Sequence, residues 1–467
     1  MKREALACLV FTMATSLLGA PVAAQENEKA LDKIFNVYAS KTSPGCAVGA
    51  TRGGTKIFAK AYGMADLEHD VPLAPQSVFY MASVSKQFMA LSILLLEQDG
   101  KLNVEDRVRK YVPELPQYAD AITIRQLLHH TSGLRDYLDL TTFSSKLNTG
   151  ITEKDVLNLL ARQARLNFVP GAEYTYSNSG YVLLSIIAQR VSGRLLDEFA
   201  RERIFMPLGM SSTRFQHDHT TPIIGRAIGY VQKADSWKIS NSMLDVVGDG
   251  GMYSSVEDML RWAAAFEKPE FAPHLARMQK IGMLSDGREI AAGYGMGLVT
   301  FMYRGQPIVG HGGSLAGYRN RLFRLPANNL TIITLCNAGM ANAVGFSQQV
   351  AELVAPADLW TAPAVATSAP PTQTAPTSPI PRDFAKAVAG VFYSAELDTI
   401  YRIVDGADGV MLEADGKTPL ALSMTGPDRL GAANVKLELV PTRDDAAKVN
   451  GFMFSALGER GIKFTRR

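Results

Sequence analysis

Cysteine is scarce in this sequence, with three residues in 467. So few cysteines cannot build a disulfide framework or a multi-cysteine zinc site. An excess of charge of either sign is also absent, because 48 Lys and Arg residues against 45 Asp and Glu residues leave a net charge of +3. Nothing in this balance predicts a nucleic acid or a membrane surface as a partner. With 47% apolar and 20% charged residues, the composition excludes a largely disordered chain.

The apolar run at the N-terminus, Ala5 to Leu18, is shorter than the about 20 residues that a membrane span needs. It follows Lys2-Arg3 and precedes the small residues Val22 to Ala24, a pattern typical of a secretory signal peptide. We therefore expect residues 1–24 to be a signal peptide and the protein to be periplasmic or secreted. Cys8 lies too early for lipid attachment, so no stable membrane anchor is expected. A buried N-terminal helix is the less favoured alternative.

The two remaining cysteines, Cys46 and Cys336, lie in strand-like runs. In an oxidising compartment they would pair if the two strands were neighbours. Cysteine is also commonly a small buried apolar residue, and this is the interpretation that the sequence favours.

The length of 467 residues exceeds what one core of ordinary size accommodates. After the signal peptide, the first piece is residues 25–358, with strand patterns at its two ends and a helix-rich middle from about 84 to 276. The strand patterns are at 45–50, 55–62, 297–303, 318–325 and 330–336, and a last helix is expected at 343–354. This order predicts an α/β lobe with a long helical insertion and an active site in the crevice between them.

The second piece, residues 359–382, is a predicted linker, because 18 of the 22 residues from Thr361 to Arg382 are Pro, Ala, Thr or Ser. Six prolines there disfavour a helix and favour a semi-extended chain. The third piece, residues 383–467, has short alternating runs at 399–404 and 435–439, separated by turn sequences. These runs predict a small all-β barrel or sandwich.

Ser83-Val84-Ser85-Lys86 opens a helical pattern that Gly100 is expected to end. Ser83 would lie at the helix N-terminus, with Lys86 one turn further on the same face. A serine hydroxyl becomes a nucleophile when a nearby base takes its proton, and the helix dipole favours negative charge at this end. Taken alone, the pattern also fits an N-cap serine followed by a surface lysine.

Two further motifs follow in order. Tyr176-Ser177-Asn178 stands before a helix expected from about Val182, and His311-Gly312-Gly313 is expected to precede a strand. With Leu127 to Leu134, these motifs resemble the serine β-lactamase and penicillin-binding-protein-like hydrolases, especially class C β-lactamases, D-alanyl-D-alanine carboxypeptidases, D-aminopeptidases and β-lactamase-like esterases. The resemblance covers about residues 30–350. It implies an antiparallel sheet flanked by helices with a helical lobe, and more weakly a lipocalin-like C-terminal domain.

The resemblance also implies roles for the motif residues. Ser83 would be the nucleophile, Lys86 its base, and Tyr176 a proton shuttle to the leaving group; Tyr174 is a rival that the spacing to asparagine disfavours. The substrate would be oriented by Asn178, His311 and Gly313, and the backbone N–H groups of Ser83 and Ser314 would form the oxyanion hole. No metal or organic cofactor is expected.

His311 stands where many relatives of this family have a lysine. A neutral imidazole supplies no fixed charge for a β-lactam carboxylate, so small peptides or amides, including D-amino-acid or peptidoglycan-derived ones, are the expected substrates, before esters and β-lactams. We also expect Lys86 to be the main influence on the Tyr176 pKa, and an alkaline activity optimum. A sensor that is acylated without turnover is the alternative from another class.

Three weaker candidates complete the sequence analysis. His129-His130 is expected to be structural. His217-Asp218-His219 has the proximity of metal ligands but no visible third ligand, so a solvated loop is favoured. Gly248 to Gly251 is expected to form a tight turn near the cleft.

Overall fold

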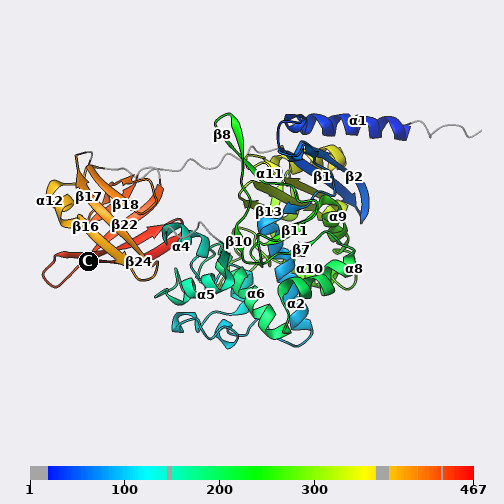
Figure 1. Ribbon diagram of the computed structural model, residues 1–467. Helices are drawn as coiled ribbons and strands as arrows, with labels where there is room; N and C mark the ends of the chain where they lie inside the picture. The colour runs from blue at the N-terminus through cyan, green and yellow to red at the C-terminus, as the bar shows by residue number, and fades with distance from the viewer. Residues whose placement is uncertain (1–18, 145–149, 364–377, 408, 433–434) are drawn as a thin grey trace, which may run out of the picture.

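The computed structural model describes residues 19–144, 150–363, 378–407, 409–432 and 435–467 (Figure 1). Most of the predicted signal peptide and residues 364–377 of the predicted linker lie outside these ranges. Residues 19–24 form the start of helix α1 (Gly19–Ile34). Among the described residues, none of the helices combines the length and the apolar character that crossing a membrane requires.

The main domain is built on one six-stranded antiparallel sheet. Its strands lie in the order β12 (Val299–Tyr303), β13 (Gln306–Leu315), β14 (Tyr318–Leu325), β15 (Leu330–Cys336), β1 (Cys46–Arg52) and β2 (Thr55–Tyr62). Because β1 pairs with β15, the two ends of the domain form one sheet around the helical middle, as the sequence predicts. His311-Gly312-Gly313 precedes a strand, β14, as expected, but it also lies within β13, a strand that the sequence analysis did not predict.

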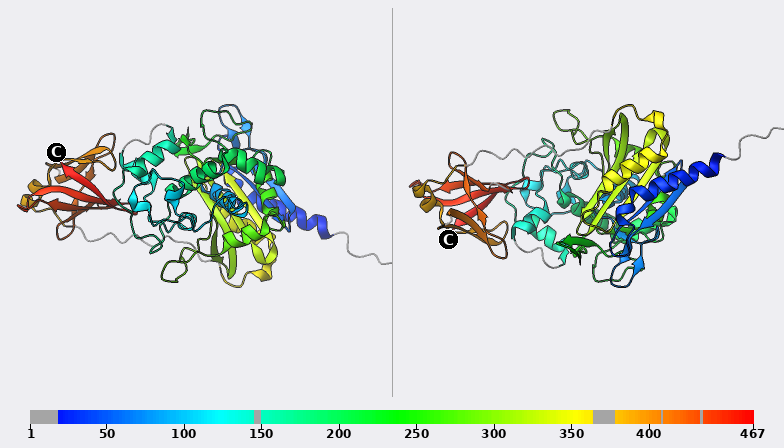
Figure 2. Two further views of the ribbon diagram at one scale, coloured as in Figure 1. Left: turned by 90° about the horizontal axis from the view of Figure 1, so that it is seen from below. Right: turned by 90° about the horizontal axis from the view of Figure 1, so that it is seen from above.

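Helices cover both faces of this sheet. On one face α1 packs against α11 (Ala343–Val354), and the two helices lie side by side across the strands (Figure 2). On the other face α9 (Val256–Ala264) packs on β1 and β15. Every residue of β15 is buried because both of its faces are covered. Burial of each such large apolar side chain stabilises the fold by roughly 1.5–3 kcal/mol.

The middle of the chain forms the helical lobe. Besides α9, its helices are α2 (Lys86–Gln98), α3 (Ile124–Leu128), α4 (Tyr137–Ser144), α5 (Glu153–Ala161), α6 (Asn178–Ser192), α7 (Leu196–Ala200), α8 (Met206–Leu208) and α10 (Ala272–Gln279). Short strands lie between and around them: β3 (Met64–Asp66), β4 (Val71–Pro72), β5 (Phe79–Tyr80), β6 (Ile151–Thr152), β7 (Arg214–Phe215), β8 (Tyr230–Lys233), β9 (Ser236–Ile239), β10 (Leu244–Asp245) and β11 (Met252–Ser254). Helix α2 is fully buried from Lys86 to Leu96 and packs against α6 and α10.

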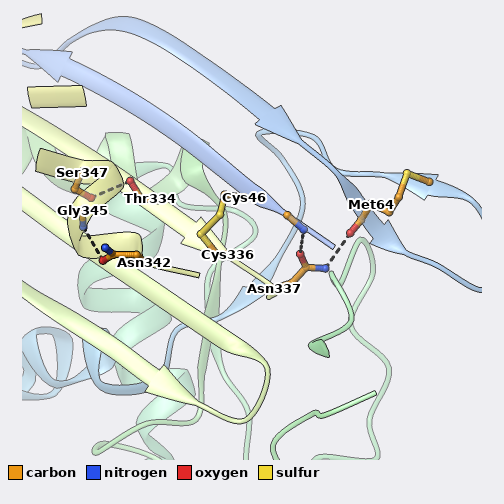
Figure 3. Close-up of a disulfide and its surroundings, with 9 residues drawn as sticks. Cys46, Met64, Thr334, Cys336, Asn337, Asn342, Gly345 and Ser347 are labelled. Carbon is orange, nitrogen blue, oxygen red and sulfur yellow. Dashed lines mark hydrogen bonds between the residues drawn. A yellow bond between two sulfur atoms is a disulfide. The ribbon is translucent and has the colours of Figure 1, made fainter. Parts of the chain in front are cut away.

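Cys46 and Cys336 form a disulfide, with an S–S distance of 2.08 Å (Figure 3). The favoured interpretation of two free buried cysteines is therefore wrong. The two residues are directly opposite each other in the β1–β15 pair, so their side chains leave the sheet on the same face. Beside the disulfide, the Asn337 side chain accepts from the Gly45 N–H and donates to the Met64 carbonyl, which fixes the end of β1.

The C-terminal domain is a nine-stranded antiparallel sheet, curled into a nearly closed barrel. Its strand order is β19 (Leu420–Ala421), β18 (Gly409–Ala414), β17 (Thr399–Gly406), β16 (Gly390–Ser394), β24 (Glu459–Arg466), β23 (Val449–Ala456), β22 (Val435–Arg443), β21 (Arg429–Ala432) and β20 (Ser423–Gly426). The predicted small β-barrel is thus confirmed, and one short helix, α12 (Arg382–Val388), precedes its strands. The barrel lies beside the helical lobe at the end that carries α4 (Figure 1), and Tyr401 donates a hydrogen bond to the Phe143 carbonyl across this contact.

Candidate active site

Ser83 lies where the chain enters helix α2. Residues Ala82–Ser85 form a single 3-10 turn that continues into α2 at Lys86, so Ser83 and Lys86 come to lie on one face. Ala82 has a φ of +46°, a conformation that costs a non-glycine residue roughly 1–2 kcal/mol. Strained backbone of this kind persists where surrounding packing imposes it. Here it turns the serine, half-buried, toward a cleft that Tyr176 also lines.

Lys86 is buried and its ammonium group is fully hydrogen-bonded. Nζ donates to Ser83 Oγ at 3.1 Å, to Asn178 Oδ1 at 2.8 Å and to the Asp249 carbonyl at 2.7 Å. Burial lowers the pKa of Lys86 to about 8, against the opposing effect of the carboxylates of Asp249 and Asp136. An amine with this pKa supplies a substantial neutral fraction near neutral pH, which a serine nucleophile requires.

Asn178 is the first residue of helix α6, which therefore starts four residues earlier than expected. The Asp136 carboxylate explains this start, because it accepts hydrogen bonds from both the backbone N–H and the side-chain Nδ2 of Asn178. With Nδ2 held by Asp136, the amide oxygen of Asn178 faces Lys86.

Tyr176 lies over the other side of the amine, with Lys86 Nζ 4.8 Å from the centre of its ring. Burial raises the Tyr176 pKa well above 10, and the opposing effect of the Ser83 hydroxyl is smaller. The phenol is therefore protonated at neutral pH. The expectation that Lys86 is the main influence on the Tyr176 pKa is wrong, because burial has the largest effect. Tyr174 does not line the cleft; its ring packs near those of His130 and Tyr294.

His311, Gly313 and Ser314 lie on β13 beyond the end of its pairing with β12, whose last pair is Val299 and Gly310. The imidazole of His311 donates from Nδ1 to the Gly312 carbonyl at 2.7 Å. Burial and the Lys86 charge lower the His311 pKa to about 3, so the imidazole is neutral. Gly313 is required by space, because a Cβ there would lie 2.2 Å from the Met81 carbonyl oxygen.

These groups converge on one cleft with a volume of about 370 Å³. It is lined by Ser83, Tyr176, His311, Gly312, Gly313, Ser314, Arg319, Asn320, Ala341, Asn342, Ala343 and Val344. The structure thus brings together all the residues that the three motifs predict: Ser83, Tyr176, His311, Gly313 and Ser314 line the cleft, while Lys86 and Asn178 lie directly behind Ser83.

Residues 25–354 match the family model described as Beta-lactamase. The chain belongs to the beta-lactamase family. Membership in this family makes the protein a hydrolase.

The similar proteins cover different shares of the chain. Penicillin-binding protein 4* of Bacillus subtilis (strain 168) is 31% identical over 329 residues, which are 67% of this chain and 72% of that protein. A D-aminopeptidase of Brucella anthropi is 29% identical over 309 residues, which are 65% of this chain and 58% of the D-aminopeptidase, so the match spans little more than half of that relative. The octameric penicillin-binding protein homologue from Pyrococcus abyssi has a TM-score of 0.61 at 20% identity, over 96% of this chain and 99% of its own, which shows a shared fold.

Three contributors to this beta-lactamase-family site were missed in the sequence: Asp136, Asp249 and Tyr294. The Asp249 carbonyl accepts from Lys86, and its carboxylate accepts from the Tyr137 hydroxyl at 2.9 Å. Its glycine-rich surroundings had predicted a turn near the cleft, and this is confirmed: Gly248 has a φ of +102° and leaves no room for a Cβ beside the Tyr181 carbonyl. The Tyr294 hydroxyl donates to His311 Nε2 at 3.4 Å. No local motif marks Asp136 or Tyr294.

The weaker candidates lie outside the cleft lining. His130 Nδ1 accepts from the Ser177 N–H at 3.1 Å, and burial lowers its pKa well below 6.5, which fits the expected structural role. Burial also lowers the pKa of His129 to about 4. Asp245 supplies the third ligand candidate that the sequence did not show beside Asp218 and His219, yet His219 Nδ1 is already bound to the Asp245 carboxylate at 2.9 Å.

Proposed function

We propose that the protein is an exported serine hydrolase that cleaves small peptides or amides through an acyl-enzyme at Ser83. The observation that carries the proposal is the 3.1 Å hydrogen bond between Lys86 and Ser83, made by an amine whose pKa burial lowers to about 8. Penicillin-binding and D-aminopeptidase relatives support amide substrates, including D-amino-acid or peptidoglycan-derived ones.

In the proposed reaction, neutral Lys86 accepts the Ser83 proton while Oγ attacks the substrate carbonyl carbon. The N–H groups of Ser83 and Ser314 stabilise the negative charge on the carbonyl oxygen; such donors are typically worth about 3–4 kcal/mol each. The Tyr176 phenol gives its proton to the leaving nitrogen as the C–N bond breaks, and it regains a proton from the Lys86 ammonium. Water then adds to the acyl-enzyme, releases the acid and restores Ser83.

The third motif supports amides over β-lactams. With a pKa of about 3, His311 carries no positive charge that would bind a substrate carboxylate. Esters rank second, because their cleavage needs no carboxylate contact and less assistance to the leaving group.

Export is supported by the disulfide between Cys46 and Cys336, since disulfides persist mainly in oxidising compartments. Cleavage after Ala24 would leave Gln25 as the first residue of the mature chain. N-terminal sequencing of the protein recovered from producing cells tests this, and an N-terminus at Met1 in that material would contradict export.

The proposal is tested by labelling with a fluorescent fluorophosphonate or penicillin probe. Ser83→Ala should abolish labelling, whereas the matched control Ser85→Ala should retain it, because the Ser85 hydroxyl is bonded to the Ala82 carbonyl. Persistent labelling of Ser83→Ala would place the nucleophile elsewhere. A panel of D- and L-aminoacyl amides, D-alanyl-D-alanine peptides, short-chain esters and nitrocefin then ranks the substrates. A stoichiometric burst without turnover on the whole panel would identify an acylated sensor instead.

A further inference from the structure

The segment Arg135–Tyr137 connects the C-terminal barrel to the active site. Arg135 binds the barrel, Asp136 binds Asn178, and the Tyr137 hydroxyl binds the carboxylate of Asp249. Asp136 and Tyr137 thus hold direct partners of Lys86. The residue before them, Arg135, is held by the C-terminal barrel.

On the barrel side, Arg135 is completely buried in an ion pair with Glu396, whose side chain is 8% exposed. The guanidinium also donates to Gln163 Oε1 at 2.6 Å and to the Arg460 carbonyl at 2.9 Å. The Glu396 carboxylate accepts in addition from the Ala164 N–H, back in the helical lobe. A buried pair with this many hydrogen bonds keeps a fixed geometry, because loss of any partner leaves a buried charge unpaired.

Glu459, at the start of β24, reaches the next residue of the segment. Its Oε1 accepts from the backbone N–H of Asp136 at 2.9 Å, and its Oε2 accepts from Asn167 Nδ2 at 3.0 Å. Glu459 is 3% exposed. The barrel therefore holds the main chain of the residue whose carboxylate holds Asn178.

The orientation of the Asn178 amide depends on this arrangement. Asp136 Oδ2 can only accept, so it selects the NH₂ end of the amide and leaves the oxygen for Lys86. If Asp136 shifted, the amide would be free to turn. Its NH₂ group would then face the Lys86 amine, a donor facing a donor, and the amine would lose one of its three fixed partners.

The barrel is rigid, so it can hold this contact in a fixed position. Its interior is filled by stacked aromatic rings, with Phe452 and Tyr401 both packed on Phe464 at 4.7 Å between ring centres. Tightly packed interiors deform little, so the barrel surface that carries Glu396 and Glu459 holds its shape.

We propose that the C-terminal barrel is part of the catalytic apparatus, with Glu459 and Glu396 as positioning residues that fix Asp136 and, through Asn178, the amine of Lys86. This inference rests on the proposed function of Ser83 and Lys86. It assigns the barrel a role in acylation that is separate from substrate access.

The test uses full-length Glu459→Ala, Glu459→Gln and the matched control Leu439→Ala, which opens a cavity in the barrel core. Leu439 is 0% exposed, so the control loses barrel stability but keeps Glu396 and Glu459, the barrel side chains that bind Arg135 and Asp136. The measured quantities are the second-order rate of fluorophosphonate labelling, kcat and KM for an aminoacyl amide, and the unfolding temperature.

Glu459→Ala should slow labelling and lower kcat by about tenfold or more, with KM within about twofold, as expected for a misplaced catalytic group. Glu459→Gln keeps an acceptor for the Asp136 N–H and should recover most of the rate. Folded Leu439→Ala should react like the wild type.

A folded Glu459→Ala protein that is labelled at the wild-type rate would overturn the inference, as would equal slowing in Leu439→Ala. Asn167→Ala removes the second partner of the Glu459 carboxylate, so if Glu459→Ala does not fold, a wild-type labelling rate in Asn167→Ala overturns it instead. If the wild-type protein resists labelling and cleaves none of the amides, the proposed function itself is wrong. This outcome distinguishes failure of the proposed function from failure of the inference about the barrel.

Discussion

The pH dependence of acylation can identify the proposed catalytic base, because the pKa values of Lys86 and Tyr176 are shifted in opposite directions. Burial lowers the pKa of Lys86 to about 8 and raises that of Tyr176 well above 10. At pH 7, forming the neutral amine then costs about 1.4 kcal/mol, whereas an amine with the ordinary pKa would cost about 5 kcal/mol. The rate should therefore rise about tenfold per pH unit below pH 8 and level off above it.

Tyr176→Phe is the decisive perturbation. It removes the proposed proton donor to the leaving group and should lower the turnover of amides. The midpoint of the alkaline rise should stay near 8, because the proposed base is Lys86, whose pKa is about 8. Tyr174→Phe is the matched control, since that ring lies outside the cleft lining and its pKa is about 12.

The assay is the second-order rate of labelling with an uncharged fluorophosphonate between pH 5.5 and 10, so that the protein alone titrates. If the increase of the labelling rate with pH disappears in Tyr176→Phe, or if its midpoint moves by more than one pH unit, the phenol is the base and this reasoning is wrong. A plateau already reached at pH 5–6 in the wild type would refute the role of neutral Lys86 as well.

Three further predictions concern stability, each measured by urea unfolding. Gly248→Ala should lower the free energy of unfolding by about 3 kcal/mol, because its Cβ would lie 2.6 Å from a backbone carbonyl oxygen. Gly193 also has a positive φ but open space around it, so Gly193→Ala should lower the free energy of unfolding by about 1 kcal/mol. Equal losses in the two variants would contradict the steric argument. Replacing Cys46 and Cys336 by alanine should cost about 2–4 kcal/mol, since the disulfide joins residues 290 apart, and an unchanged stability would show that the pair contributes nothing. The His311 pKa of about 3 lies below the ordinary 6.5, so between these values the unfolded chain binds a proton that the folded chain does not, and stability falls as pH falls. Between pH 7 and pH 5, the free energy of unfolding of His311→Asn should therefore fall by about 2 kcal/mol less than that of the wild type. Equal falls would refute the lowered His311 pKa.

Local sequence patterns predicted the elements whose signals are complete within the element. The bounds of β2, β14, β15 and α11 match the expected residues, because alternation or helical periodicity ends there at a turn or a cap. Helix α11, for example, begins after Asn342, whose side chain accepts from the Gly345 N–H. The spacing of Ser83 and Lys86 is equally local, since one helical turn suffices to bring the two side chains together.

Features set by distant residues were missed. The start of α6 at Asn178 depends on Asp136, 42 residues earlier, which takes the place of a local N-cap side chain. The glycine-rich third motif has low strand propensity, and it becomes part of β13 because β14 pairs with it throughout. The Cys46–Cys336 disulfide follows from the register of β1 against β15, which neither strand encodes alone.

Two opposed effects of the buried carboxylates set the base strength of the site. Asp136 and Asp249 place the partners of Lys86, but their negative charges also raise the Lys86 pKa and so favour the ammonium form. Burial outweighs them and leaves the value near 8. A cation at position 311 would lower the Lys86 pKa further, yet it would itself have to be charged in a site that already drives the His311 pKa to about 3. A neutral histidine there is consistent with a site that obtains its neutral amine from desolvation instead of from a neighbouring charge.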